Sequence, residues 1–229
     1  MIVSLWLFVA FSFAISSGAA CVRPVNTSTD PIAGVAQTRT VKDRTLTSTH
    51  MPAVRLEFSQ PFRYAGGHSF ILYEVANAEQ HFFVDADKDG RIKRMYWIQF
   101  EGYLPSNTHA YDYKSPKTVN IGGLDFFADA YARNIKASPG RPDSDGSRAR
   151  AFLASKSYRF VSEEVAFVRL VHLVDKAKRN ELMIIYLEDL SLVEITAADL
   201  TAGGRLAEHW EAFSAKLLER ALKDMKLSR

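Results

Sequence analysis

The chain has 229 residues, of which 47% are apolar, 24% charged and 12% aromatic, and these proportions exclude a disordered or low-complexity protein. Its 29 basic and 26 acidic residues give a net charge of +3. Part of that excess lies in the first fifty residues, so the remainder is nearly neutral and its charge does not predict a nucleic-acid-binding protein.

The N-terminal segment predicts export or anchoring. Residues 2–20 contain no charge and no proline, and they end in the small residues of 16–20. An apolar run that ends in this way is typical of a signal peptide, and it is also long enough for a membrane anchor. No basic residue precedes it, which is unusual for both. We expect an extracytoplasmic protein, periplasmic or secreted, with residues 1–20 as signal peptide or anchor.

Cys21 is the single cysteine of the chain and directly follows Gly18-Ala19-Ala20. This arrangement resembles a bacterial lipobox, in which such a cysteine is acylated, although Gly18 stands where leucine is usual. Lipidation at Cys21, with anchoring through residues 1–21, and an ordinary signal peptide therefore both stay open. One cysteine excludes an intramolecular disulfide and a metal-thiolate cluster in the folded part.

Residues 21–51 are rich in Thr, Ser, Val and Pro and follow no sustained period. Such a segment buries too little apolar surface to offset its chain entropy, so it predicts a flexible tether. A single folded domain is then expected over residues 52–229.

The domain begins with period-two alternation, which predicts half-buried strands. Four strands are expected over residues 52–59, 68–75, 81–85 and 91–101, followed by helices over 122–135 and 148–156. Two strands, 159–174 and 182–187, and an amphipathic C-terminal helix over 206–225 complete the chain. This order predicts an α+β fold: one antiparallel sheet of about six strands with helices on one face.

Asp85, Asp87 and Asp89, followed by Gly90, look like the first half of an EF-hand calcium loop. Position twelve is Tyr96 in place of the bidentate glutamate, and the flanking segments predict strands. The competing interpretation is a hairpin turn, in which glycine supplies a positive φ. We favour the turn and keep a weak calcium site as the alternative; no other cofactor is expected.

Tyr103, Tyr111 and Tyr113 lie on a long predicted loop, close in sequence to Trp97. Tyrosines on such loops often line a binding surface, because each ring has an apolar body and a polar tip. These four residues are the candidate ligand- or partner-binding set. Packing of the loop on the domain is the simpler alternative.

No nucleophile elbow, phosphate-binding glycine loop or histidine-rich metal motif is present. We therefore expect a non-enzymatic extracytoplasmic domain that binds a small ligand or an envelope protein and meets the membrane through its N-terminus. The alternative is a hydrolase- or transferase-like enzyme with a dispersed site of tyrosine, His68 or His81, and Asp85. A cluster of titratable groups with perturbed pKa values in one cleft would favour the enzyme. A third possibility is an envelope subunit that docks another protein by a sheet edge or by the tyrosine loop.

Overall fold

The computed structural model describes residues 39–115, 117–137 and 140–229. The chain divides into two units, residues 1–30 and 31–229, and every described residue belongs to the second. Within the described ranges, no helix combines the length and the apolar character needed to cross a bilayer.

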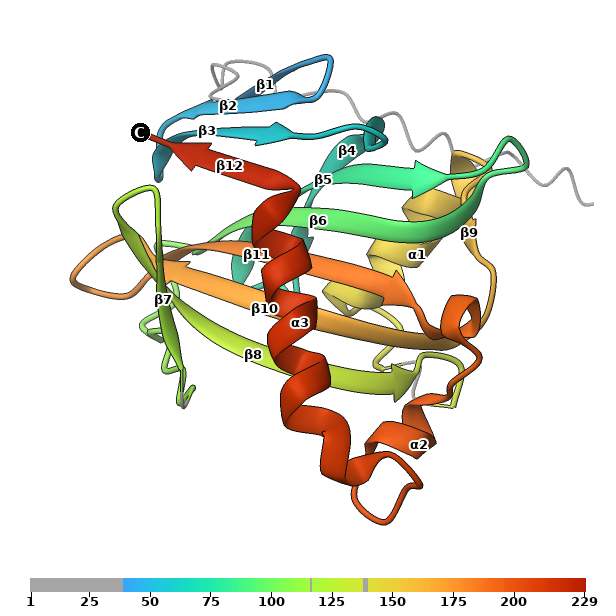
Figure 1. Ribbon diagram of the computed structural model, residues 1–229. Helices are drawn as coiled ribbons and strands as arrows, with labels where there is room; N and C mark the ends of the chain where they lie inside the picture. The colour runs from blue at the N-terminus through green and yellow to red at the C-terminus, as the bar shows by residue number, and fades with distance from the viewer. Residues whose placement is uncertain (1–38, 116, 138–139) are drawn as a thin grey trace, which may run out of the picture. The chain divides into compact units, whose positions relative to one another are not determined.

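An eight-stranded sheet forms the centre of this unit (Figure 1). Seven strands lie in the order β4-β5-β6-β11-β10-β8-β7, each antiparallel to its neighbour, and the short β9 pairs with β6 in parallel. Their bounds are β4 Arg63–Leu72, β5 Ala76–Ala86, β6 Arg91–Tyr103, β7 Thr118–Ile121, β8 Leu124–Asn134, β9 Arg159–Phe160, β10 Glu164–Leu173 and β11 Asn180–Asp189.

A second, four-stranded antiparallel sheet joins the start of the described chain to its end. Its order is β1-β2-β3-β12, with bounds β1 Arg39–Lys42, β2 Thr45–Thr49, β3 Ala53–Phe58 and β12 Met225–Ser228. The helices are α1 Asp145–Ser155, α2 Ala197–Leu200 and α3 Trp210–Lys223, with 3-10 turns η1 Leu190–Val193 and η2 Ala207–His209.

The large sheet is covered on both faces. On the face that we call the front, α3 crosses β11, β10 and β8, and the small sheet packs beside it (Figure 1). Helix α1 covers part of the opposite, back face. Successive residues of a strand point to opposite faces, so Tyr96 and Ile98 of β6 enter the front core while Met95 and Trp97 enter the back core.

The expected α+β class is wrong. The described residues form twelve strands in two sheets and only three short α-helices. The helices also lie on both faces of the large sheet and not on one.

The segment expected as a helix over 122–135 is strand β8, which pairs with β10 along its length. Burial alternates along β8: Phe126 and Ala128 face the front core, while the opposite side carries Phe127 on the back core and the exposed Tyr131. These two aromatic residues interrupt the alternation of apolar and polar residue types, and with Leu124 and Ala128 they match helical spacing by coincidence.

Two boundaries also change. Residues 39–49, expected in the tether, form β1 and β2, and Leu46 of β2 is fully buried. The C-terminal helix ends at Lys223, and the chain then forms β12 against β3. The expected signal or anchor, Cys21 and the rest of residues 1–38 lie outside the described residues.

Candidate functional site

Two glutamates lie directly opposite each other on the back face. Glu101 of β6 and Glu181 of β11 are cross-strand partners, and Glu181 is only 2% exposed. Opposed residues of an antiparallel pair have Cβ atoms about 5 Å apart, and like charges at such positions are destabilising. The two strands thus bring together two carboxyl groups that cannot both ionise without cost.

Two tyrosines cover this pair. The hydroxyl of Tyr111 donates to Oε1 of Glu101 at 2.8 Å, and that of Tyr113 donates to Oε2 of Glu181 at 2.7 Å. The ring of Tyr111 stacks on Tyr113 at 6.3 Å and on Tyr103 at 4.5 Å between centroids. We call Tyr103, Tyr111 and Tyr113 the tyrosine stack; its two inner members are held by the buried carboxyl groups.

A chain of side-chain amides reaches Glu101 from the other side. Gln80, fully buried, donates to the backbone carbonyl of Asp145 at 3.2 Å and to Oε1 of Gln99 at 2.8 Å. A carbonyl only accepts, so this contact fixes the orientation of the Gln80 amide. The Gln99 amide nitrogen must then donate to Oε2 of Glu101, at 2.6 Å. At the far end, the Gln80 amide oxygen faces Nε2 of His68 at 2.8 Å.

Asp145, the first residue of α1, adds a third carboxyl group. Its Oδ1 accepts from the backbone N–H of Gly146 at 2.7 Å. The positive charge of Arg169 favours ionisation of both Asp145 and Glu181. The guanidinium itself bonds Asp129 at 2.7 Å, and none of the ion pairs among the described residues joins it to Asp145 or Glu181. We call Glu101, Glu181 and Asp145 the carboxyl cluster.

The protonation of the carboxyl cluster follows from burial and from the number of donors. Burial raises the pKa of all three groups, and for Glu181 it raises the pKa to about 8. Glu101 accepts two side-chain hydrogen bonds, from Gln99 and Tyr111, which favour its ionised form. Glu181 accepts one, from Tyr113. The glutamate pair therefore holds a proton to higher pH than separate, hydrated glutamates would, with the pKa raised to about 8 at Glu181.

The structure brings three of the four candidate binding residues together as the tyrosine stack. Trp97 shares their face of the sheet but packs on Phe82 in the back core, with 8% of its surface exposed and its indole Nε1 without a hydrogen-bond partner. Sequence reasoning missed the carboxyl cluster and the amide chain. One signal was present: Gln99 and Glu101 follow Trp97 at alternate positions of one strand, as polar residues on a buried face.

Of the residues of the enzymatic alternative, the structure brings His81 to a tyrosine, while His68 and Asp85 lie in other networks. His68 belongs to the amide chain on the back face. His81 lies on the front face, where its Nδ1 meets the Tyr64 hydroxyl at 2.9 Å and its Nε2 meets Glu79 at 2.7 Å. Asp85 is bonded to Arg94.

The aspartate loop is a turn. One carboxylate oxygen of Asp87 accepts from the backbone N–H groups of Asp89 and Arg91, at 2.9 and 3.0 Å. Gly90 has a φ of +75° and lies against the carbonyl of Ser157, so a Cβ there would be 2.1 Å from that oxygen. No three His, Cys, Asp or Glu residues in the described ranges are grouped so that they could hold a metal ion. In the described structure, Asp85 and Asp87 are engaged by Arg94 and by the backbone of the turn.

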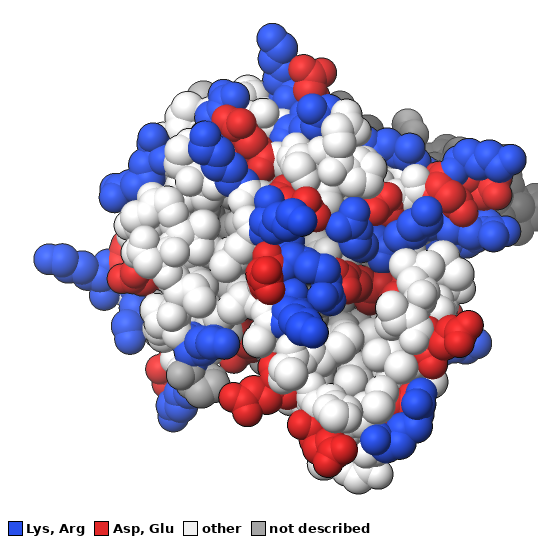
Figure 2. Space-filling view, in the orientation of Figure 1, with Lys and Arg blue, Asp and Glu red and all other residues white. Residues whose placement is uncertain are grey.

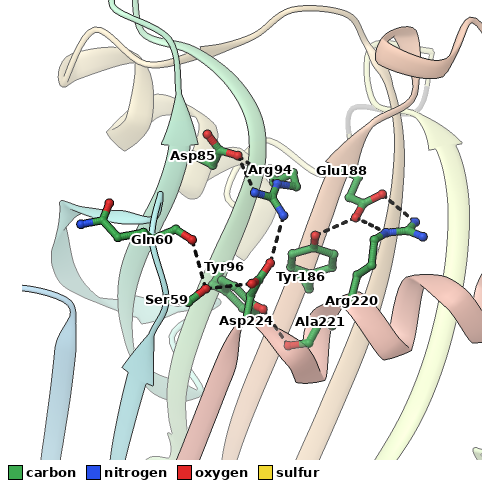
Figure 3. Close-up of polar contacts among 10 residues, drawn as sticks. All are labelled: Ser59, Gln60, Asp85, Arg94, Tyr96, Tyr186, Glu188, Arg220, Ala221 and Asp224. Atoms are coloured by element: carbon green, nitrogen blue, oxygen red, sulfur yellow. Dashed lines mark hydrogen bonds and ion pairs between the residues drawn. The ribbon is translucent and has the colours of Figure 1, made fainter.

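The front face carries a different polar network, drawn in Figure 3. Arg94 of β6 bonds Asp85 and Asp224, at 2.8 and 2.9 Å, and Asp224 also accepts from Ser59 at 2.8 Å. Burial alone would lower the pKa of Arg94, but the bonds to Asp85 and Tyr186 outweigh it and raise the pKa. The network joins the end of α3 to both sheets.

A second part of the front network centres on Glu188. Arg220 of α3 holds its two oxygens at 2.7 and 2.8 Å, and Tyr186 donates to it at 2.6 Å. Tyr96 donates to the carbonyl of Ala221 at 2.6 Å. Figure 2 shows acidic and basic side chains interleaved over this face. The front network is a structural clasp, because each of its carboxylates has a cationic partner.

Two hollows lie away from the carboxyl cluster. One, of about 330 Å³, is lined by the turn at residues 49–53 together with His172 and Arg229. The other, of about 570 Å³, lies over β1, β2 and β3. The titratable cluster that would favour an enzyme is thus present, but neither hollow opens onto it. Comparisons of the chain with protein-family models, with curated proteins and with solved structures find no match.

Proposed function

We propose that this chain is a non-enzymatic binding domain that acts outside the cytoplasm and engages its partner through the tyrosine stack. The observation that carries the proposal is the anchoring of Tyr111 and Tyr113 by buried carboxyl groups. A surface that is ordered before binding loses less entropy when a partner arrives. Simple packing of a loop does not require two buried acids beneath it.

The outer member of the stack supports a contact role. Tyr103 is partly exposed, with His109 at 6.2 Å from its ring and the Arg179 guanidinium at 5.9 Å. Arg179 in turn donates to the carbonyls of Leu104 and His109, at 2.9 and 3.1 Å, which fixes the segment beside the ring. A partly exposed tyrosine held in one orientation is the kind of residue that dominates binding energies at protein interfaces.

Site-specific photo-crosslinking tests the contact. A photoreactive amino acid replaces Tyr103 in the full chain in its native cells, and a matched variant carries it at Tyr158, which is also partly exposed and lies beside the opposite end of β6. We expect a discrete adduct from position 103 alone. Equal adducts from both positions, or none from position 103, contradict the proposal.

The location rests on the apolar N-terminal segment and needs its own test. Intact-mass analysis of protein from native membranes distinguishes the alternatives. Cleavage before Cys21 with added acyl chains indicates a lipoprotein, and cleavage without them indicates an ordinary signal peptide. An unmodified full chain recovered from the cytosol contradicts export.

A second candidate, an enzyme, is favoured by one observation: two buried carboxyl groups with different hydrogen-bond partners lie directly opposite each other, as in acid–base pairs. Its test is turnover of nitrophenyl glycosides and esters by the full chain. Activity that falls at least hundredfold in Glu181→Gln supports an enzyme, and wild-type turnover no faster than buffer contradicts it.

A further inference from the structure

We propose that the carboxyl cluster is a proton-operated latch that holds residues 109–115 against the back face in acid and releases them as the pH rises. The inference rests on the proposed function for its purpose, because these residues carry two members of the tyrosine stack. Its physical basis is independent: it needs only the described contacts.

The latch segment is fixed near its two ends by backbone contacts. The N–H of Tyr111 donates to the carbonyl of Lys178 at 2.8 Å, and the Ser115 hydroxyl donates to the carbonyl of Ala128 at 2.6 Å. Between these points, the side chains of Tyr111 and Tyr113 hold it to Glu101 and Glu181. These two side chains therefore close the middle of the segment over the glutamate pair, and water that reaches the pair must displace them.

The charge balance beneath the segment decides when this happens. The groups that act directly on Glu181 are Glu101 of β6, Asp145 of α1, Arg169 of β10 and Tyr113 of the segment. Others act through these: Tyr111 bonds Glu101, Asp129 and Tyr131 of β8 bond Arg169, and His68 reaches Glu101 through the amide chain. Arg179 bonds the carbonyl of His109 and lies beside the ring of Tyr103, and the segment itself also carries His109, Asp112 and Lys114. Arg169 forms its ion pair with Asp129, and none of the ion pairs among the described residues joins it to Glu101 or Glu181, so a second negative charge at the glutamate pair has no directly bonded cation.

Loss of the proton from Glu181 therefore places two carboxylates opposite each other in a dry site. Water relieves that repulsion best, and it enters where the cover is attached by side chains alone. Proton linkage gives the direction in which pH shifts the opening of the segment. The closed state holds the proton up to about pH 8, whereas an opened, hydrated glutamate loses it near its ordinary value of 4.5. Opening of the segment is therefore favoured as the pH rises from about 4.5 to about 8.

Hydrogen exchange on the full chain, without any partner, tests the latch. The opening equilibrium of the peptide covering residues 109–115, corrected for intrinsic exchange, should rise by up to about tenfold per pH unit between about pH 5 and 8 and then level off. Glu181→Gln should make it independent of pH. The same pH dependence in Glu181→Gln, or protection that grows with pH, overturns the proposal.

Glu188→Gln is the matched control, because Glu188 lies on the same strand and also accepts a tyrosine hydroxyl, but it faces Arg220 on the front. It should keep the wild-type pH dependence of the segment; loss of that dependence would overturn the proposal. If Glu181→Gln does not fold, carbon-13 NMR of glutamate carboxyl groups in the wild type decides. One glutamate titrating above pH 7 supports the latch and none overturns it. A pH-dependent segment without a Tyr103 crosslink would refute the proposed function and leave the latch standing.

Discussion

The two faces of the large sheet differ in whether their buried carboxyl groups have arginine partners. On the front, Arg94 and Arg220 bond Asp85, Asp224 and Glu188, and all five side chains keep some contact with solvent. On the back, Glu101, Glu181 and Asp145 gather near Arg169, whose guanidinium is bonded to Asp129. A buried carboxylate with an arginine partner stays ionised, whereas one without a free partner takes up a proton. The front network therefore contributes to stability over a wide pH range, and the back cluster responds to pH.

The largest expected effect comes from breaking the front network at its centre. Arg94→Met should lower the free energy of unfolding by about 3 kcal/mol, because Asp85 and Asp224 are left without their cation. Urea denaturation at pH 7 measures it. Arg205→Met, which breaks the exposed pair with Asp199, is the control and should leave the midpoint within error. Equal midpoints for the two variants would show that the front network is not a clasp.

A substitution in the carboxyl cluster should raise the free energy of unfolding, in contrast to Arg94→Met. Glu181→Gln should raise the free energy of unfolding by about 1–2 kcal/mol at pH 8 and by much less at pH 5. The folded-state pKa of Glu181 is raised to about 8. The protonated Glu181 side chain therefore contributes fully to the free energy of unfolding below the unfolded-state pKa of this residue. That contribution is lost as the pH rises toward 8. Denaturation of both proteins at the two pH values measures the change. Destabilisation of equal size at both would mean that Glu181 is an ordinary partner and not a proton store.

Two tyrosine variants test the same difference between the front and back faces, with a smaller expected change in stability. Tyr96→Phe removes the donor to Ala221 and should cost about 1 kcal/mol, equally at pH 5 and pH 8. Tyr113→Phe removes the donor to Glu181, which favours the ionised form, so its cost should grow with pH. Thermal and urea unfolding at both pH values distinguish them. A cost for Tyr113→Phe that is flat with pH would contradict the different roles of the two faces.

The smallest expected effect concerns the aspartate turn beside the front network. Asp85 is engaged by Arg94, and Asp87 accepts two backbone N–H groups. Millimolar calcium should therefore shift the melting temperature by less than about 1 °C relative to chelator, because a ligand that does not bind does not stabilise. A larger, saturable rise would restore the calcium interpretation.

Much of the local structure could be predicted from alternation alone. The expected strand over 91–101 lies within β6, and the helix expected over 148–156 is α1 within a few residues. Strand β6 was recognised because its residues alternate between two sets of side chains over eleven positions, although both faces are buried. Strand β8 was missed because Phe127 and Tyr131 on its less buried face match helical spacing, and β12 because four residues after a helix are too short to carry a pattern. Together with the unexpected strands β1, β2 and β7, these errors turned a mostly β protein into an expected α+β one.

The sequence predicted the tyrosines of the candidate site but not its buried glutamates. The tyrosines stood out in the sequence because aromatic residues on a long loop are unusual, and the stack brings them together. Glu101 and Glu181 did not stand out, because a lone glutamate near the end of a strand is ordinarily solvated. Their meeting depends on the register between β6 and β11, which lie far apart in the chain. No local pattern encodes that register.

The sequence by itself determined the absence of an internal disulfide, since the chain has one cysteine, and the positions of the longer strands β3, β4, β5, β6, β10 and β11, since side chains alternate with period two. Tertiary structure alone decided which faces are covered and which carboxyl groups become neighbours. The reason is physical: alternation is a property of a few consecutive residues, whereas burial and charge repulsion depend on which strands lie side by side. Burial raises the pKa of Glu181, and so do Glu101 of β6 and Asp145 of α1, whereas Tyr113 of the latch segment and Arg169 of β10 lower it; all of these neighbours are distant in sequence.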